Sequence, residues 1–120
     1  MLARKFRLRR SKDCQHVWQS GRSVQVPELR LKFCRRQEQP VRVAVVVGKK
    51  VLKLAVQRNR LRRRLGEIIR LNFALVPPRL DLLVIAKTAK VCELSSPALT
   101  EVLQTLLQRI SVPREVVRLK

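Results

Sequence analysis

The chain has 120 residues and a hydrophobic fraction of 46%, which is enough for one buried core and argues against disorder throughout. Lys and Arg number 28 against 8 Asp and Glu, so the formal net charge is +20 and the pI is near 11.8. A compact fold tolerates such an excess poorly without a polyanionic partner, and the composition therefore favours a nucleic-acid binder. We expect one domain over residues 1–120, with a basic arm over about 1–10 and a loose tail over about 112–120.

The sequence offers little for disulfides, metals or membranes. Cys14, Cys34 and Cys92 are far apart with no C-x-x-C pair, and His16 is the single histidine. These spacings predict no disulfide framework and no metal bound by the protein, and they favour a reducing cytoplasm. The longest apolar runs, 43–47 and 82–86, are five residues each, whereas a membrane helix needs about 20. Charges interrupt the amino terminus, so we expect no secretory signal.

The first half of the chain predicts a helix followed by strands. A helix is expected over 12–20, with Ser11 as its N-cap and Gly21 as its C-cap. Apolar and polar residues then alternate over 29–34, which is the pattern of a strand with one buried face. After a turn at 37–40, the apolar run 41–47 predicts a strand buried on both faces, ended by Gly48.

The second half predicts a long helix, a strand and a last helix. Over 51–73 the apolar period becomes helical, with one buried face made by Leu54, Leu61, Leu65, Ile68, Ile69 and Asn72, and with Asn59, Arg63 and Arg70 facing away. Pro77 and Pro78 end this helix, and 80–86 is a buried strand. The last helix is expected from Ser96, as N-cap before Pro97, to Ile110. This order of elements implies an α/β sandwich with helices on a small sheet.

The positive charge lies mainly in the first half of the chain. Residues 1–64 carry a net charge of +17 and residues 65–120 a net charge of +3. Eight cations and no acid fall within 49–64: Lys49, Lys50, Lys53, Arg58, Arg60, Arg62, Arg63 and Arg64. They are either a solvated helix face or a binding surface. Like charges at i,i+4 repel by about 0.2–0.5 kcal/mol per pair, whereas RNA or DNA phosphates would reverse the sign, so a binding surface explains the cluster better.

Aromatic residues are scarce, which limits base stacking. Phe33 and Phe73 are expected in the core, while Trp18 is either a core residue or a stacking platform.

The run Gly48-Lys49-Lys50-Val51-Leu52-Lys53-Leu54-Ala55-Val56-Gln57-Arg58-Asn59-Arg60-Leu61-Arg62-Arg63 resembles the signature of the bacterial ribonuclease P protein subunit. The hallmark is Arg-Asn-Arg followed, one position on, by two basic residues. The opening 8–23 also matches, with Asp13, Val17, Gly21 and Ser23 in place, and 81–87 resembles the family's last strand. The resemblance covers roughly residues 8–110.

The resemblance implies a fold and a function. The fold would be an α/β (α+β) two-layer sandwich of four strands and three helices, like the second domain of ribosomal protein S5, with a left-handed βαβ crossover. The protein would bind ribonuclease P RNA and the 5′ leader of precursor tRNA, and assist removal of the leader. The RNA would be the catalyst and would require Mg²⁺, while the protein alone would be inactive, bind no cofactor and need neither a membrane nor an obligate protein partner.

Two sets of residues carry these roles by similarity. The RNA subunit would be contacted by Lys49, Lys50, Lys53, Arg58, Asn59, Arg60, Arg62 and Arg63. A cleft between the first helix and the open sheet face would receive the leader on Cys14, Trp18, Arg30, Lys32 and Lys87.

The sequence departs from the family at a few of these positions. Cys14 replaces the usual aromatic residue, so stacking would rest on Trp18. Gly66 stands where relatives commonly carry an arginine, and we expect Arg64 to compensate in part for the lost charge. Arg58 falls near the apolar stripe, so its stem is expected at the edge of the core.

Two other classes of function compete with this reading. A protein nuclease would need clustered carboxylates or a histidine pair, yet the acids are scattered singly, and Asp81 is expected to be structural. A general RNA-binding or ribosome-associated protein would share the basic surface, but the context of Arg58-Asn59-Arg60 argues against it.

Overall fold

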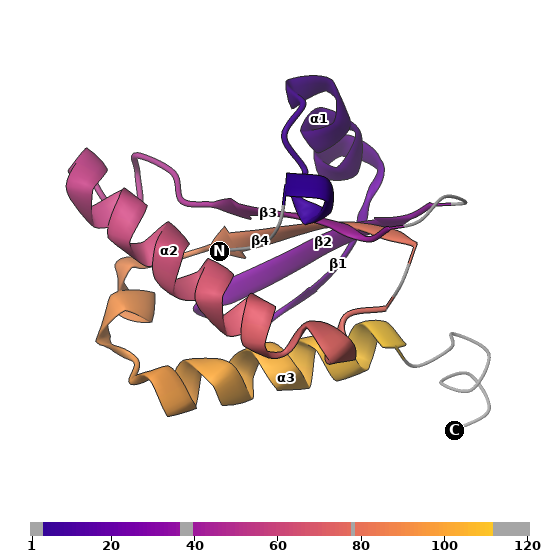
Figure 1. The fold of residues 1–120 in the computed structure, drawn as a ribbon. Helices are drawn as coiled ribbons and strands as arrows, with labels where there is room; N and C mark the ends of the chain where they lie inside the picture. Colours follow the sequence, from indigo (N-terminus) through magenta and orange to yellow (C-terminus); the bar gives the residue numbers. More distant parts are fainter. Residues whose placement is uncertain (1–3, 37–39, 78, 112–120) are drawn as a thin grey trace.

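The computed structural model describes residues 4–36, 40–77 and 79–111. The strands are β1 (Arg22–Gln25), β2 (Leu29–Arg35), β3 (Arg42–Val46) and β4 (Leu80–Ala86). The helices are α1 (Ser11–Ser20), α2 (Ala55–Leu71) and α3 (Ser96–Ser111), with short 3₁₀ helices η1 (Arg4–Phe6), η2 (Phe73–Leu75) and η3 (Ala89–Glu93). Helix α1 lies on one face of the sheet, and α2 and α3 lie on the other (Figure 1). The predicted α/β sandwich of four strands and three helices is confirmed.

The sheet has the strand order β1-β2-β4-β3. Strand β4 pairs antiparallel with β2 and parallel with β3, so β3, α2 and β4 form a βαβ unit. All seven residues of β4 are buried, as its apolar sequence predicts. Strand β3 is an edge strand, and Ala44, Val45 and Val46 are only partly buried. The prediction that 41–47 is buried on both faces is therefore correct only in part: each face contacts an apolar layer, but at the edge of the sheet these layers cover Ala44, Val45 and Val46 incompletely.

Two apolar layers separate the helices from the sheet. The larger lies under α2 and α3, where Leu31, Leu65 and Leu103 are fully buried. The smaller lies under α1 and consists of Leu8, Val17, Leu83 and Ile85, with Cys14 and Cys34 packed against it. The alternation of β2 separates these layers, since Leu29, Leu31 and Phe33 face α3 while Arg30, Lys32 and Cys34 face α1.

Helix α1 begins one residue earlier than expected. Ser11 lies inside the helix, and Arg10 at the N-cap makes no capping hydrogen bond with its side chain, so the capping role of Ser11 is wrong. Gly21 ends the helix as predicted, and its N–H donates to the Val17 carbonyl at 2.8 Å. A Cβ atom at this position would lie 2.3 Å from that carbonyl oxygen of α1 and 3.1 Å from the Phe33 carbonyl oxygen of β2, so the passage of the chain from α1 into the sheet requires glycine.

Helix α2 is shorter than the predicted 51–73. The backbone N–H groups of Val51 and Leu52 both donate to the Gly48 carbonyl, which makes a turn where a helix was expected. Leu54 is the N-cap residue and is 61% exposed, so it does not belong to the buried stripe. Asn72 ends the helix, and its side-chain amide donates to the Ile68 carbonyl at 2.8 Å.

The remaining elements differ from the predictions at their ends. In α3 the capping oxygen belongs to Ser95, whose hydroxyl accepts the Ala98 N–H at 3.2 Å, one residue before the expected Ser96. Phe33 and Phe73 pack at the periphery of the large core rather than inside it. Strand β1 was expected only from the resemblance. The predicted turn at 37–40 lies mostly outside the described residues, as does the tail from 112.

The described part of the basic amino-terminal segment packs on the fold. Leu8 is 4% exposed, and its N–H donates to the Val43 carbonyl at 2.9 Å. Arg7 forms an isolated parallel bridge with Val43. Residues 4–10 thus run along β3, on the open edge of the sheet. Within the described ranges, no helix has the length and hydropathy that crossing a bilayer demands.

Candidate nucleic-acid interface

Trp18 and Lys32 meet on the α1 face of the sheet. Trp18 is 46% exposed, and the core position of α1 is taken by its fully buried neighbour Val17. The Lys32 ammonium lies 5.2 Å from the centroid of the indole ring and also donates to the Trp18 carbonyl. A cation near an aromatic face and near the last turn of a helix is favoured by the ring quadrupole and by the helix dipole. Trp18 is therefore an exposed ring with a cation held against it, and not a core residue.

Two further cations lie beside this pair. Arg30 is two residues from Lys32 on β2, so the two side chains leave the same face of the strand roughly 7 Å apart. Arg30 Nε and Lys87 Nζ both donate to the Gln25 side-chain oxygen, at 3.0 and 2.9 Å. The five side chains form one surface, which we call the Trp18 surface: Trp18, Gln25, Arg30, Lys32 and Lys87.

Cys14 belongs to α1, and its side chain faces the sheet rather than the solvent. Its thiol points to the Leu8 carbonyl at 3.8 Å and is packed in the smaller apolar layer. Burial, followed by the nearby Asp13 carboxylate, raises the pKa of the Cys14 thiol. Of the residues expected in one cleft, the structure therefore brings together four and places Cys14 at the edge of the smaller core.

A second basic surface follows one stripe of α2. Asn59, Arg62, Arg63 and Gly66 stand at i, i+3, i+4 and i+7, so they share one side of the helix. Together with Arg7, Arg9 and β3 they line a groove of about 490 Å³. We call this the α2–β3 groove. Arg62 donates to the side-chain oxygen of Asn59, which orients the guanidinium along the stripe.

The groove contains two cations that the sequence did not assign. Arg7 and Arg9 are both exposed, and the backbone hydrogen bond between Leu8 and Val43 brings them opposite Arg62 and Arg63. Gly66 leaves this end of the stripe open, because a Cβ atom there would meet nothing within 4 Å. Arg7 and Arg9 lie about 50 residues before the α2 stripe in the sequence. Apart from their charge, no local sequence pattern indicates that they reach the groove.

Three residues of the basic cluster lie on the turn that precedes α2. Lys49, Lys50 and Lys53 are all exposed, and the turn places them beyond the amino-terminal end of the helix. Arg60 is exposed on α2 itself and makes no ion pair with any residue in the described ranges. These four cations are available to an anionic partner.

Two other arginines of the cluster stabilise the protein's own loops. Arg58 donates to the carbonyls of Leu52 and Lys53 at 2.9 and 2.8 Å, which fixes the turn before α2. Its stem is partly buried, as expected from its place near the apolar stripe. Arg64 donates to the Leu94 carbonyl, which joins α2 to the start of α3. Arg64 therefore points away from Gly66, and the expected compensation for the missing arginine is wrong.

A charged cluster fixes α1 to the sheet. Asp81 is 7% exposed, and its two carboxylate oxygens accept from Arg42 Nε and Nη2 at 2.8 and 2.7 Å. Arg42 Nη1 also lies 3.3 Å from Asp13 in the first turn of α1, and Arg36 approaches Asp81 at 3.6 Å. The hydrogen bond to Asp81 raises the pKa of the Arg42 guanidinium. Asp81 therefore has the structural role expected from the sequence.

Potential metal ligands are dispersed. Over the described residues, no three His, Cys, Asp or Glu side chains come close enough to hold one ion. Glu67 forms an ion pair with Arg70, and the hydrogen bond from Arg70 lowers the pKa of Glu67 to about 2.

Comparison with known proteins finds relatives of this sequence and this fold in one family. The Ribonuclease P family matches residues 2–111. The ribonuclease P protein component of Roseiflexus castenholzii is 34% identical over 111 residues, covering 92% of this chain and 90% of that protein. The solved ribonuclease P protein from Thermotoga maritima superposes with a TM-score of 0.79 at 28% identity, covering 88% of this chain and 98% of that chain. The Staphylococcus aureus ribonuclease P protein, 22% identical with a TM-score of 0.76 over 89% of this chain and 96% of that chain, shares the fold. The chain with these two cationic surfaces belongs to the ribonuclease P protein family.

Proposed function

We propose that this protein binds ribonuclease P RNA through the α2–β3 groove and through the turn that carries Lys49, Lys50 and Lys53, which we call the lysine turn. We propose further that it binds the 5′ leader of precursor tRNA on the Trp18 surface. The observation that carries the proposal is the presence of two separate cationic surfaces on one small fold of this family. One surface lies under α1 and the other beside α2, which covers the opposite face of the sheet (Figure 1). Such an arrangement suits a protein that holds two RNA segments at once.

The chemistry of the two surfaces differs, and this supports different ligands. The α2–β3 groove and the lysine turn supply cations without an exposed aromatic ring, which suits the phosphate backbone of a folded RNA. The Trp18 surface combines an exposed indole with cations, which suits single-stranded RNA because an unpaired base stacks while its phosphate meets Lys32. The 5′ leader of precursor tRNA would be such a single-stranded segment.

In this proposal the RNA subunit performs the hydrolysis with Mg²⁺, and the protein positions the substrate. The engagement of Asp13 and Asp81 with Arg42, and of Glu67 with Arg70, supports a non-catalytic role for these carboxylates. The three free thiols support a place of action in the cytoplasm. No observation favours a general RNA-binding or ribosome-associated role.

Leader binding is tested with a single substitution at Trp18. Trp18→Ala should weaken binding of precursor tRNA by the reconstituted holoenzyme by about tenfold, because one base–aromatic stack contributes about 1–3 kcal/mol. Binding of mature tRNA, which has no leader, should stay unchanged. Trp18→Phe keeps an aromatic ring and should recover most of the affinity. Equal losses for precursor and mature tRNA would contradict the proposal and assign Trp18 to a structural role.

A further inference from the structure

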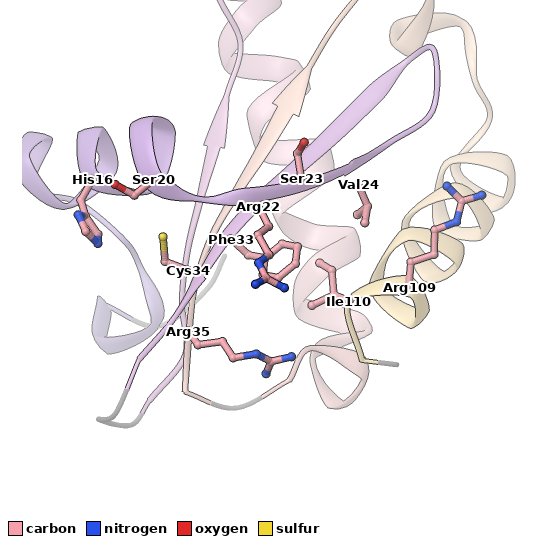
Figure 2. A pocket seen from close by; sticks show the side chains of 10 residues that line it. All are labelled: His16, Ser20, Arg22, Ser23, Val24, Phe33, Cys34, Arg35, Arg109 and Ile110. Carbon is pink, nitrogen blue, oxygen red and sulfur yellow. The ribbon is translucent and has the colours of Figure 1, made fainter. Parts of the chain in front are cut away.

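A second hollow lies at the far edge of the sheet, away from the α2–β3 groove. It measures about 650 Å³ and opens where β1 begins, between α1 and the carboxyl-terminal end of α3 (Figure 2). None of the functional residues assigned above lines it. We call it the α1–α3 pocket.

The register of β1 and β2 creates this pocket. Arg22, the first residue of β1, pairs with Phe33, whereas β2 continues for two further residues to Arg35. The edge of β2 is therefore uncovered by β1 past Phe33. Because side chains alternate along a strand, Phe33 and Arg35 project to the same face, and Arg22 projects beside Phe33 as its cross-strand partner. Helix α3 closes this side with Arg109 and Ile110.

The pocket is strongly cationic, and no acidic side chain of the described residues lines it. None of the ten side chains labelled in Figure 2 is acidic, and three of them are arginines. Arg22 and Arg35 are exposed and make no hydrogen bond or ion pair with the residues that the structure describes. Arg109 makes a single long hydrogen bond of 3.4 Å to the Gln25 carbonyl. This bond directs Arg109 toward the last residue of β1, away from Arg22 at its first residue. Arg22 and Arg35 remain as two like charges on one hollow with no acidic partner among the described residues, which favours a polyanionic ligand over an empty site.

The lining is also amphipathic, which indicates more than a bare anion. Phe33 is only partly buried and provides an apolar wall beside the arginines, while Ile110 is 2% exposed and belongs to the core against which Phe33 packs. An aromatic wall next to guanidinium groups is the combination that accepts an unpaired base with its phosphate.

The pocket is distinct from the Trp18 surface. Its α1 side is formed by His16 and Ser20, each two residues from Trp18. At 100° per residue these side chains lie 200° around the helix from Trp18, so α1 separates the two regions.

We propose that the α1–α3 pocket binds one nucleotide of a single-stranded RNA, with its phosphate on Arg22 and Arg35 and its base against Phe33. The proposal takes RNA as the polyanion, and so rests on the proposed function in that one respect. The pocket would add a third point of RNA contact, separate from both surfaces described above.

The chain contains its own reporters for a direct test. His16 is the single histidine and lines the pocket, while Trp18 is the single tryptophan and lies on the other flank of α1. Pentauridylate is titrated into the protein alone, with the His16 imidazole proton followed by NMR and Trp18 by fluorescence. We expect a saturable shift of the His16 signal in the wild-type protein. In Arg22→Gln/Arg35→Gln the His16 response should need about tenfold more oligonucleotide, while the Trp18 response is retained.

A matched variant separates the pocket from general charge. Lys5→Gln/Lys90→Gln removes the same number of charges from two exposed positions outside the assigned surfaces and should leave the His16 response close to wild type. An unmoved His16 signal when the Trp18 response is saturated would overturn the proposal. So would an equal weakening by both double variants, or an equal His16 shift with inorganic phosphate at matched phosphate concentration, which would indicate an anion site only.

Two further binding experiments distinguish whether the bound nucleotide comes from the leader or from the RNA subunit. If the leader supplies the nucleotide, Arg22→Gln/Arg35→Gln weakens holoenzyme binding of precursor tRNA with a long leader but not of precursor with a short leader. If the RNA subunit supplies it, the same variant weakens binding of that RNA without substrate. A wild-type response in both arms, together with normal cleavage, would overturn the pocket's role in the holoenzyme and leave the proposed function intact.

Discussion

The ion pair between Asp81 and Arg42 is the clearest energetic feature of the fold, and it predicts a large loss of stability in Asp81→Asn. The variant keeps the size of the side chain but replaces the carboxylate with an amide. One oxygen still accepts a hydrogen bond, while the amide NH₂ group faces the guanidinium and cannot accept. Arg42 Nε or Nη2 then loses its partner.

The magnitude follows from the burial of the two partners. Removal of one member of a buried ion pair costs about 3–5 kcal/mol. Asp81 is 7% exposed, but a quarter of the Arg42 side chain is exposed and Asp13 remains 3.3 Å away, so Arg42 keeps one carboxylate and some water. We therefore expect a loss of about 2–3 kcal/mol in the free energy of unfolding, below the full cost of a buried unpaired charge.

Urea unfolding followed by circular dichroism measures this loss. For a urea dependence of about 1–3 kcal/mol/M, the midpoint of Asp81→Asn should fall by about 0.7–3 M. Glu67→Gln is the matched control, since it makes the same kind of change in an exposed pair with Arg70 and should leave the midpoint unchanged. A loss below about 1 kcal/mol for Asp81→Asn, or equal midpoints for the two variants, would refute the account of a buried structural pair.

Three further predictions follow from single residues. Gly66→Ala should raise the free energy of unfolding by about 0.5–1 kcal/mol, because glycine is a poor helix former and a Cβ atom there meets nothing within 4 Å; a lower urea midpoint would contradict this. In a short pulse of iodoacetamide, mass spectrometry should find Cys92 modified before Cys14 and Cys34, because burial raises the pKa of the last two thiols and Cys92 is exposed; equal rates would contradict it. Arg60→Ala should lower the slope of log affinity against log salt, for the RNA subunit, by nearly one unit without changing the urea midpoint, and an unchanged slope would count against a phosphate contact.

Elements with a strong apolar period were predictable from the sequence, and elements without one were not. Strand β4 matches its predicted bounds of 80–86, because a short apolar run with β-branched residues suits a strand buried on both faces. Strand β1 has one apolar residue, Val24, among four, so its pairing with β2 decides its structure rather than its own pattern. The predicted start of α2 was too early. Leu52 and Leu54 are apolar and suggest that the helix continues, but the Val51 and Leu52 N–H groups donate to the Gly48 carbonyl and form a turn instead.

The part of the candidate site whose cations are close together in the sequence was predictable. The cluster from Lys49 to Arg63 is visible in the sequence because its cations are neighbours. Arg7 and Arg9 were missed because a backbone hydrogen bond to β3 brings them to the groove. Arg64 belongs to the same charge run, yet it is used to hold the Leu94 carbonyl.

The α1–α3 pocket was also missed, since no local pattern contains it. Its residues come from α1, β1, β2 and α3, and only the register of β1 against β2 brings Arg22 and Arg35 to one hollow. Charge counts alone cannot distinguish such a convergence from solvated surface arginines.

The most direct measurement is cleavage of precursor tRNA at low Mg²⁺ by a bacterial ribonuclease P RNA, with and without this protein. The proposed function predicts that the protein stimulates cleavage at the mature 5′ end and has no activity alone. Tight binding of a cognate RNA without any stimulation of cleavage would contradict the account.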